Sequence, residues 1–190
     1  SGSVESAIQT LYPNNRIDIV SVDSDPKSAA TLIADIHDFV RTQLFTWKPG
    51  HFDILWASPP CTQYSRAKSV GERDLDGADT LVAAALACML HLKPRYWFLE
   101  NPLGMLSTRP LMIPFEPYLH KVSYCHYGEP VRKDTCIWTN APVNNLRLCR
   151  KGNMCFTKSQ NGHHTRTAQS GPTSLAPGSG GAKNVYHIPR

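Results

Sequence analysis

Residues 53–61 read Asp53-Ile54-Leu55-Trp56-Ala57-Ser58-Pro59-Pro60-Cys61, an apolar run that ends at two prolines and a cysteine. A short continuous apolar run is typical of a buried strand in a parallel sheet. A second such run, residues 96–99, leads directly into Glu100-Asn101-Pro102, and residues 78–92 between the two runs have apolar side chains at helical spacing. This order predicts a Rossmann-like α/β sheet in which Cys61 and Glu100 follow strand ends and face one pocket.

The remaining sequence predicts further elements of the same kind. A β-branched run at residues 17–22 ends at Asp23, where nucleotide-binding sheets hold ribose hydroxyls, although an aspartate ahead of a proline is also a common turn former. We expect a strand over this run and a helix over residues 27–34 that Asp35-Ile36 closes. The other expected elements are a helix at 4–11, strands at 121–124 and 135–139, and irregular backbone from about 142, most of all at 159–183.

Charge is distributed unevenly along the 190 residues, whose net charge is +5. Residues 1–119 hold ten Lys or Arg against thirteen Asp or Glu, whereas residues 120–190 hold ten against two. A basic segment with interleaved aromatic residues favours a polyanionic partner, with a solvated, loop-rich surface as the alternative. The length predicts one domain. The sequence has no secretion signal and no run of eighteen apolar residues, so we expect an intracellular protein that does not enter a membrane.

Six cysteines are present, at positions 61, 88, 125, 136, 149 and 155. The enzyme-like α/β pattern without a secretion signal favours free thiols or metal ligands over disulfides. Cys88 falls at a core position of the expected helix, so we interpret it as a small buried residue. Cys61 and Glu100 together suggest a nucleophile and its acid, with a turn thiol and a strand-end cap as the alternatives.

Several short motifs occur in the order in which one known family has them. They are Ser1-Gly2-Ser3, Asp23, Asp35-Ile36, Pro59-Pro60-Cys61 with Ser65, Glu100-Asn101-Pro102, and Tyr127-Gly128-Glu129-Pro130 followed by basic residues. In this combination the chain resembles the DNA (cytosine-5) methyltransferases, and is similar to a reduced viral or phage-like member. The resemblance covers residues 1–140 and implies a catalytic domain there. Residues 141–190 would be a short irregular basic segment for nucleic-acid contact or a zinc knuckle. An expression scar is the alternative for residues 1–3.

The resemblance implies methyl transfer from S-adenosylmethionine to C5 of cytosine in DNA. Cys61 would add to C6 so that C5 can attack the methyl group, which calls for an electropositive, partly exposed thiol. Glu100 would donate a hydrogen bond to N3, and it must then hold a proton in a desolvated pocket. Arg132 would hold the cytosine carbonyl, with Lys133 as the next candidate, because this segment lacks the family's Gln-x-Arg-x-Arg pattern.

The resemblance also implies two sets of binding residues. Those expected at the cofactor are Gly2, Ser3, Asp23, Asp35, Ile36, Ser58 and Pro59. Those expected at the flipped substrate base and its backbone are Pro60, Ser65, Arg66, Asn101 and Lys133. The loop at 66–77 would be a lid. The family's first strand and its late Asn-containing motif have no counterpart, so a second chain or a missing segment would complete the cofactor site.

A possible metal knuckle follows the catalytic region. Cys149 and Cys155 are spaced C-x5-C-x7-H-H with His163 and His164. We expect zinc on Cys149, Cys155 and His163, with His164 or Cys125 as a fourth ligand. The alternative is a set of polar loop residues near phosphate.

Three alternative functions also fit the motifs. They are cytosine-C5 methylation of RNA, methylation of a pyrimidine nucleotide, and an inactive relative that acts as a DNA-binding or regulatory partner. The intact pair of Cys61 and Glu100 argues against the inactive relative. The Glu100-Asn101-Pro102 motif and the basic last third favour a polymer over a nucleotide.

Overall fold

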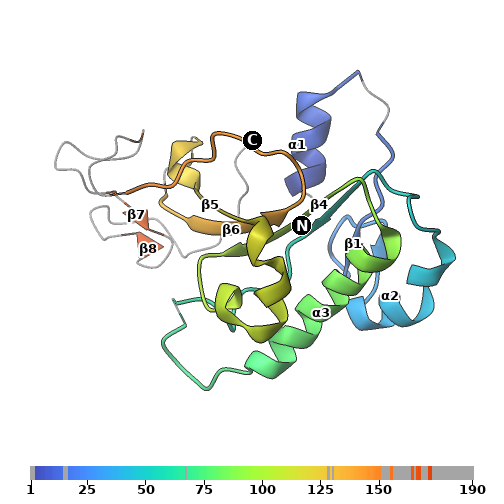
Figure 1. Ribbon diagram of the computed structural model, residues 1–190, viewed down its shortest axis with the longest axis horizontal. Coiled ribbons are helices and arrows are strands. Elements are labelled where there is room, and N and C mark those ends of the chain that lie inside the picture. The colour runs from blue at the N-terminus through green and yellow to red at the C-terminus, as the bar shows by residue number, and fades with distance from the viewer. Residues whose placement is uncertain are drawn as a thin grey trace.

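A computed structural model describes residues 3–14, 17–66, 68–127, 129, 131–150, 155, 164, 166–167 and 171–172. The chain folds as a mixed α/β structure, which confirms the predicted fold class (Figure 1). The helices are α1 (Ser3–Leu11), α2 (Ile36–Thr42) and α3 (Leu75–Leu92), with 3-10 helices at Leu44–Thr46, Leu106–Thr108, Pro110–Tyr118 and Tyr124–His126. The strands are β1 (Val22–Asp23), β2 (Leu32–Ile33), β3 (Ile54–Ala57), β4 (Tyr96–Pro102), β5 (Leu119–Ser123), β6 (Asp134–Thr139), β7 (Arg166–Thr167) and β8 (Gly171–Pro172).

The central sheet has four strands in the order β3-β4-β6-β5. β3 and β4 are parallel and are joined through α3, as the two apolar runs predicted. β6 runs antiparallel to both β4 and β5. β1 and β2 form a separate parallel pair, and β7 and β8 a separate antiparallel one. The parallel β3-α3-β4 unit therefore carries both expected functional motifs, and the antiparallel strands extend the sheet next to it.

α3 is the helix on which both core clusters are built. It begins after Asp74, whose Oδ1 accepts the Gly77 N–H at 2.8 Å, and this cap places the start three residues before the predicted one. One face, with Val82 and Met89, packs in a cluster with Leu99 and Trp138 of the sheet. By length and apolar composition alone α3 could cross a membrane, but 44% of it is buried and it lies in the core.

The second cluster joins α2 to the other face of α3. Phe39 of α2 and Leu44 pack against Cys88 and Leu92 of α3, and α2 and α3 lie side by side in Figure 1. Cys88 is 6% exposed, so the prediction of a small core residue there is confirmed.

The expected helix over residues 27–34 is wrong. The Oδ1 atoms of Asp23 and Asp25 accept the N–H groups two residues ahead, at 2.9 Å each, and these side-chain turns replace a helical start. The chain then forms β2 instead. Asp35 does not close a helix but begins α2, because its Oδ1 accepts the His37 N–H at 2.8 Å. Of the expected strand at 17–22, only Val22 pairs, together with Asp23.

β4 is longer than predicted, and this changes the place of Glu100. The strand continues through Pro102 because β6 pairs along its second half, with Glu100 opposite Ile137 and Asn101 opposite Cys136. Glu100 therefore lies within a strand, whereas Cys61 lies in a loop after the end of β3. Residues 142–150 contain no helix or strand, as expected for the start of the irregular segment.

Candidate active site

The loop after β3 presents Cys61 through a tight turn. The Cys61 carbonyl accepts the N–H of Tyr64 at 3.0 Å and that of Ser65 at 2.9 Å. Asn101, which is fully buried, donates from Nδ2 to the Pro59 carbonyl at 3.0 Å. The residue after Glu100 in β4 is thus bonded to the residue two before Cys61. This bond brings the two sequence motifs together, as the parallel strand order predicted.

Glu100 is buried in a charged pocket. Its residue is 6% exposed, and its Oε1 accepts the Tyr124 hydroxyl at 3.2 Å. The Lys133 Nζ lies 3.5 Å from the same oxygen, and it also lies over the Tyr124 ring, 4.9 Å from the centroid. Both side chains of the ion pair are almost wholly buried, so their attraction is weakly screened by solvent.

Cys61 is electrostatically coupled to this ion pair. Burial raises the pKa of the Cys61 thiol, the Lys133 ammonium lowers it, and the Glu100 carboxylate raises it. The net direction is upward because desolvation disfavours the thiolate more than Lys133 favours it. The expected electropositive group is therefore present, but it does not outweigh the burial of the thiol.

Lys133, rather than Arg132, lies in the pocket with Glu100. The Arg132 guanidinium bonds the Asp134 carboxylate, with Nη2 2.7 Å from Oδ2. Asp134 also accepts the hydroxyl of Ser123. The signal that could have separated the two basic residues is the alternation of side chains leading into β6. Lys133 and Thr135 are buried on one face, whereas Arg132 and Asp134 are partly exposed on the other.

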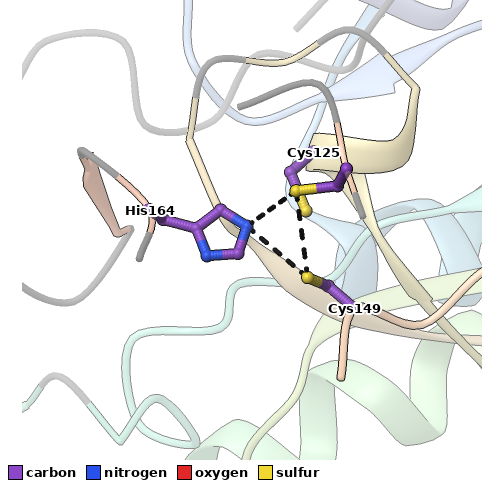
Figure 2. A group of neighbouring side chains, drawn as sticks. Cys125, Cys149 and His164 are labelled. Atoms are coloured by element: carbon purple, nitrogen blue, oxygen red, sulfur yellow. Dashed lines mark hydrogen bonds between the residues drawn. The ribbon is translucent and has the colours of Figure 1, made fainter. Parts of the chain in front are cut away.

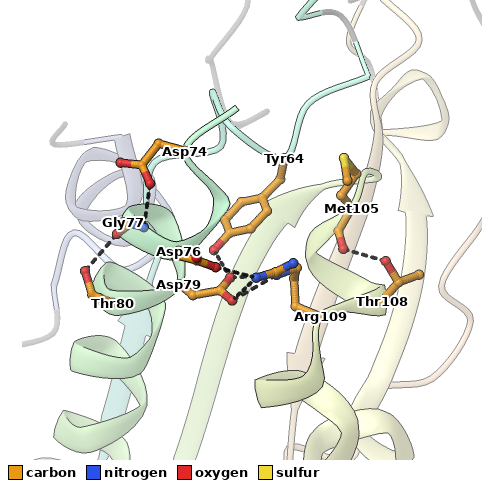
Figure 3. Close-up of polar contacts among 9 residues, drawn as sticks. All are labelled: Tyr64, Asp74, Asp76, Gly77, Asp79, Thr80, Met105, Thr108 and Arg109. Atoms are coloured by element: carbon orange, nitrogen blue, oxygen red, sulfur yellow. Dashed lines mark hydrogen bonds and ion pairs between the residues drawn. The ribbon is translucent and has the colours of Figure 1, made fainter. Parts of the chain in front are cut away.

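A second polar network holds the Cys61 loop in place, and the sequence did not predict it (Figure 3). The Tyr64 hydroxyl donates to Asp79 Oδ1 at 2.7 Å, and Arg109 Nη2 lies 2.7 Å from Asp79 Oδ2. The Tyr64 carbonyl accepts the Met105 N–H at 2.9 Å. A Cβ on Gly104 would lie 2.3 Å from that carbonyl oxygen, so this approach requires a glycine. Burial raises the pKa of Tyr64, which keeps the phenol a donor.

The expected lid loop, residues 66–77, bonds both to itself and to the turn that follows Cys61. Arg73 donates to the carbonyls of Gln63, Ser65 and Lys68. The Lys68 ammonium donates to the Gln63 side chain and to the Glu72 carbonyl. These two cations therefore shape the loop next to Ser65.

Of the residues expected at the cofactor, Asp23 ends β1, and Ser58 and Pro59 follow β3. The backbone N–H of Asp25 lowers the pKa of the Asp23 carboxyl, which keeps it ionised. The Ser58 Oγ accepts Trp56 Nε1 at 2.9 Å. Asp35 and Ile36 begin α2. Ser3 begins α1, and Gly2 lies outside the described residues.

A group of metal-ligand side chains lies beyond β5. Cys125, Cys149, Cys155 and His164 place one ligand atom each within 4.8 Å of one another. Figure 2 shows Cys125, Cys149 and His164 pointing toward a common centre. Cys149 and Cys155 are thus together as expected. His163 lies outside the described residues, and the two residues expected as alternatives for the fourth ligand, Cys125 and His164, complete the group.

The chain is similar to known DNA methylases. A family model described as "C-5 cytosine-specific DNA methylase" matches residues 11–121, a span that includes Cys61 and Glu100 and ends before Lys133. A "Probable DNA (cytosine-5)-methyltransferase" of Frog virus 3 (isolate Goorha) is 30% identical over 129 residues, which cover 60% of this chain and 58% of that protein. The chain therefore spans less than two thirds of the length of that relative.

One solved structure overlaps this fold in part. It is a crystal structure described as a "putative DNA modification methyltransferase encoded within prophage" (E. coli), with 15% sequence identity and a TM-score of 0.44. The overlap covers 64% of this chain and 39% of that one.

Proposed function

The chain belongs to the C-5 cytosine-specific DNA methylase family, and from that membership we propose that it transfers a methyl group from S-adenosylmethionine to C5 of cytosine in DNA, with Cys61 as nucleophile. The observation that carries this proposal is the joint placement of Cys61 and Glu100. A buried asparagine bonds the Cys61 loop to the strand of Glu100, and a buried lysine acts electrostatically on both groups.

The residues along β1 and β3 fit S-adenosylmethionine. Asp23 keeps an ionised carboxylate at the end of β1, and a carboxylate there can accept both hydroxyls of a ribose. Asp35 caps α2 from an exposed position beyond β2, and Ser58 and Pro59 continue from β3 toward Cys61. Bound S-adenosylmethionine would supply an electrophilic methyl group on its sulfonium.

Cys61 begins the reaction as a thiol. Its sulfur forms a bond to C6 of the cytosine while its proton passes to water, the C5–C6 electron pair forms a double bond between C4 and C5, and the negative charge moves to N3. The Lys133 ammonium favours the thiolate form that attacks, and so opposes the effect of burial on the pKa of Cys61. C5 then has enamine character and can attack the methyl carbon.

Glu100 stabilises the negative charge that the addition of Cys61 leaves on the ring. Among the described residues both polar contacts of its carboxyl group fall on Oε1, from Tyr124 and Lys133, so Oε2 can face N3 of the base. A proton taken up from water and shared between Glu100 and N3 neutralises the ring, and the Lys133 ammonium stabilises the Glu100 carboxylate when that proton lies on N3. Arg132 is held by Asp134, so we assign the cation of the pocket to Lys133.

The reaction ends with the release of Cys61. After methyl transfer, C5 carries both the methyl group and its original proton. Water accepts that proton, its electron pair re-forms the C5–C6 double bond, and the Cys61 thiolate leaves from C6. N3 gives up the shared proton and the thiolate takes a proton back from water, so the product is 5-methylcytosine and the thiol is regenerated.

DNA as the substrate follows from the family and agrees with the charge of the last third of the chain. A base within a duplex must be flipped out to reach a half-buried thiol. Ser65 and Arg66 follow Cys61 and are the residues we assign to the phosphates beside the flipped nucleotide, next to the loop that Arg73 holds in shape. Residues 120–190, with ten basic and two acidic side chains, would add sequence-independent affinity.

The test is methyl transfer from labelled S-adenosylmethionine, followed by nucleoside analysis. We expect label in 5-methylcytosine of DNA with the native protein and with Cys88→Ala, a matched control for a buried thiol far from the base. Cys61→Ala should lose the activity by a factor of about a thousand or more. RNA of the same sequence should remain unlabelled. Label in DNA from Cys61→Ala, or label in RNA alone, would contradict the proposal.

A further inference from the structure

We propose that Cys125, Cys149, Cys155 and His164 form a structural zinc site that fastens the chain beyond β6 to the segment that supplies Tyr124 to the catalytic pocket. None of the six cysteines forms a disulfide, and four ligand atoms from separate parts of the chain converge within 4.8 Å. Three thiolates and one imidazole are a common ligand set of closed, tetrahedral zinc sites.

The distances fit one ion at the centre. Tetrahedral zinc with usual bond lengths places two sulfur ligands about 3.8 Å apart, and a sulfur and a nitrogen about 3.5 Å apart. The Sγ atoms of Cys149 and Cys155 are 4.0 Å apart. The His164 Nε2 lies 3.5 Å from Cys149 Sγ and 3.1 Å from Cys155 Sγ. These spacings match metal ligands, and all four ligand atoms lie within 4.8 Å of one another.

The neighbourhood supports a structural ion rather than a catalytic one. Cys125 is fully buried and Cys149 is 2% exposed, so water has little access from their side. All four positions of a tetrahedral ion are taken by protein ligands, whereas a catalytic zinc keeps one position open for water or substrate. Binding would release the protons of the three thiols, and its free energy would add to the stability of the folded chain.

Two hydrogen bonds of Ser123 connect this site to the catalytic pocket. The Ser123 N–H donates to the Arg147 carbonyl at 2.9 Å, and the Ser123 hydroxyl accepts the Cys149 N–H at 2.8 Å. Tyr124 lies between Ser123 and Cys125, and its hydroxyl is bonded to Glu100. An ion bound by Cys125 and Cys149 would therefore hold the chain in place on both sides of Tyr124, the residue that bonds Glu100. The far ligands Cys155 and His164 would bring the basic segment to the same place.

Metal analysis of the purified protein tests the site directly. We expect about one equivalent of zinc per chain. Cobalt replacing zinc should give the absorption bands of a tetrahedral thiolate site. His164→Ala should lose the ion, and His163→Ala is the matched control that should keep it. Less than a tenth of an equivalent in folded native protein, even after zinc is supplied, would overturn the proposal. Loss of zinc from His163→Ala with retention in His164→Ala would overturn the ligand set.

Limited trypsin digestion tests the fastening role without measuring activity. Removal of zinc by a chelator should speed cleavage at Arg147 and Arg150 tenfold or more, while cleavage at Arg41 in α2 stays unchanged as an internal control. Equal cleavage at Arg147 and Arg150 with and without zinc would refute the role, even if the ion binds.

Discussion

Removal of the Lys133 ammonium should destabilise the protein because it leaves Glu100 charged and buried. The two groups are 3.5 Å apart, and their side chains are 10% and 8% exposed. At an effective dielectric constant of about 20, charges at this distance attract by about 5 kcal/mol, from which the desolvation of both groups is subtracted. Breaking a buried pair by removing one partner costs about 3 to 5 kcal/mol.

We expect Lys133→Met to lie near the lower end of this range, at about 3 kcal/mol, because the Tyr124 hydroxyl still donates to Glu100 at 3.2 Å. Methionine keeps the length of the side chain and removes its charge. Adding Glu100→Gln to this variant removes the unpaired charge, so the double variant should regain about 2 kcal/mol relative to Lys133→Met.

Urea unfolding followed by tryptophan fluorescence measures these differences, since Trp138 is buried in β6. The two single variants and the double variant complete a cycle that isolates the coupling between Lys133 and Glu100. A double variant no more stable than Lys133→Met would show that the two groups do not stabilise each other. The reasoning would then be refuted.

Three other predictions follow from the same contacts. Asp79→Asn should lower the free energy of unfolding by about 1 to 2 kcal/mol. Asp76→Asn changes a side chain that is 100% exposed and should lower it by no more than about 0.5 kcal/mol. Urea unfolding measures both changes. Equal losses would contradict this. The pKa of Cys88 is raised to about 11 from 9.0, so stability is full below about pH 9 and falls as pH rises toward 11, by up to about 3 kcal/mol. In Cys88→Ala, the free energy of unfolding should fall less between pH 9 and pH 11, as measured by urea unfolding at several pH values. A fall as large as that of the native protein would count against this prediction. Glu100→Gln should speed iodoacetamide alkylation of Cys61 at pH 7.5 several-fold by lowering its pKa, and slower alkylation would reverse the assigned sign.

The parts of the fold that local sequence patterns determine were predicted well. Residues 54–57 and 96–99 are continuous apolar runs, and α3 has a helical apolar period, so their strand, helix and strand identities do not depend on distant residues. The end of β4 could not be predicted in this way. It depends on pairing with β6, more than thirty residues further along the chain.

The errors near Asp35 have a local cause. Aspartate occurs at helix starts, in turns and at strand ends, so its identity alone leaves its role open. Asp23 and Asp25 form side-chain turns that prevent a helix, whereas Asp35 caps the start of α2. Without the hydrogen-bond partners, the residue type favours none of these roles over the others.

The sequence predicted that the motifs of Cys61 and Glu100 would meet, but not every residue that surrounds them. Cys61 and Glu100 follow recognisable motifs, and the bond between Asn101 and Pro59 brings them together. The choice between Arg132 and Lys133 depends on which face of β6 meets the pocket, and that is fixed by the pairing of β6 with β4 and β5. The approach of Cys149 to Cys125 also depends on a contact distant in sequence, since the Cys149 N–H donates to the hydroxyl of Ser123 at the end of β5.

Covalent trapping shows whether Cys61 forms a bond to the cytosine. The protein is incubated with S-adenosylmethionine and DNA that contains 5-fluorocytosine, whose fluorine cannot leave as the C5 proton does, so the adduct accumulates. Mass spectrometry of peptides then locates the modified residue. We expect a methylated, fluorinated base bonded to the sulfur of Cys61, and no adduct in Cys61→Ala. An adduct on another residue, or none from folded protein that binds S-adenosylmethionine and DNA, would contradict it.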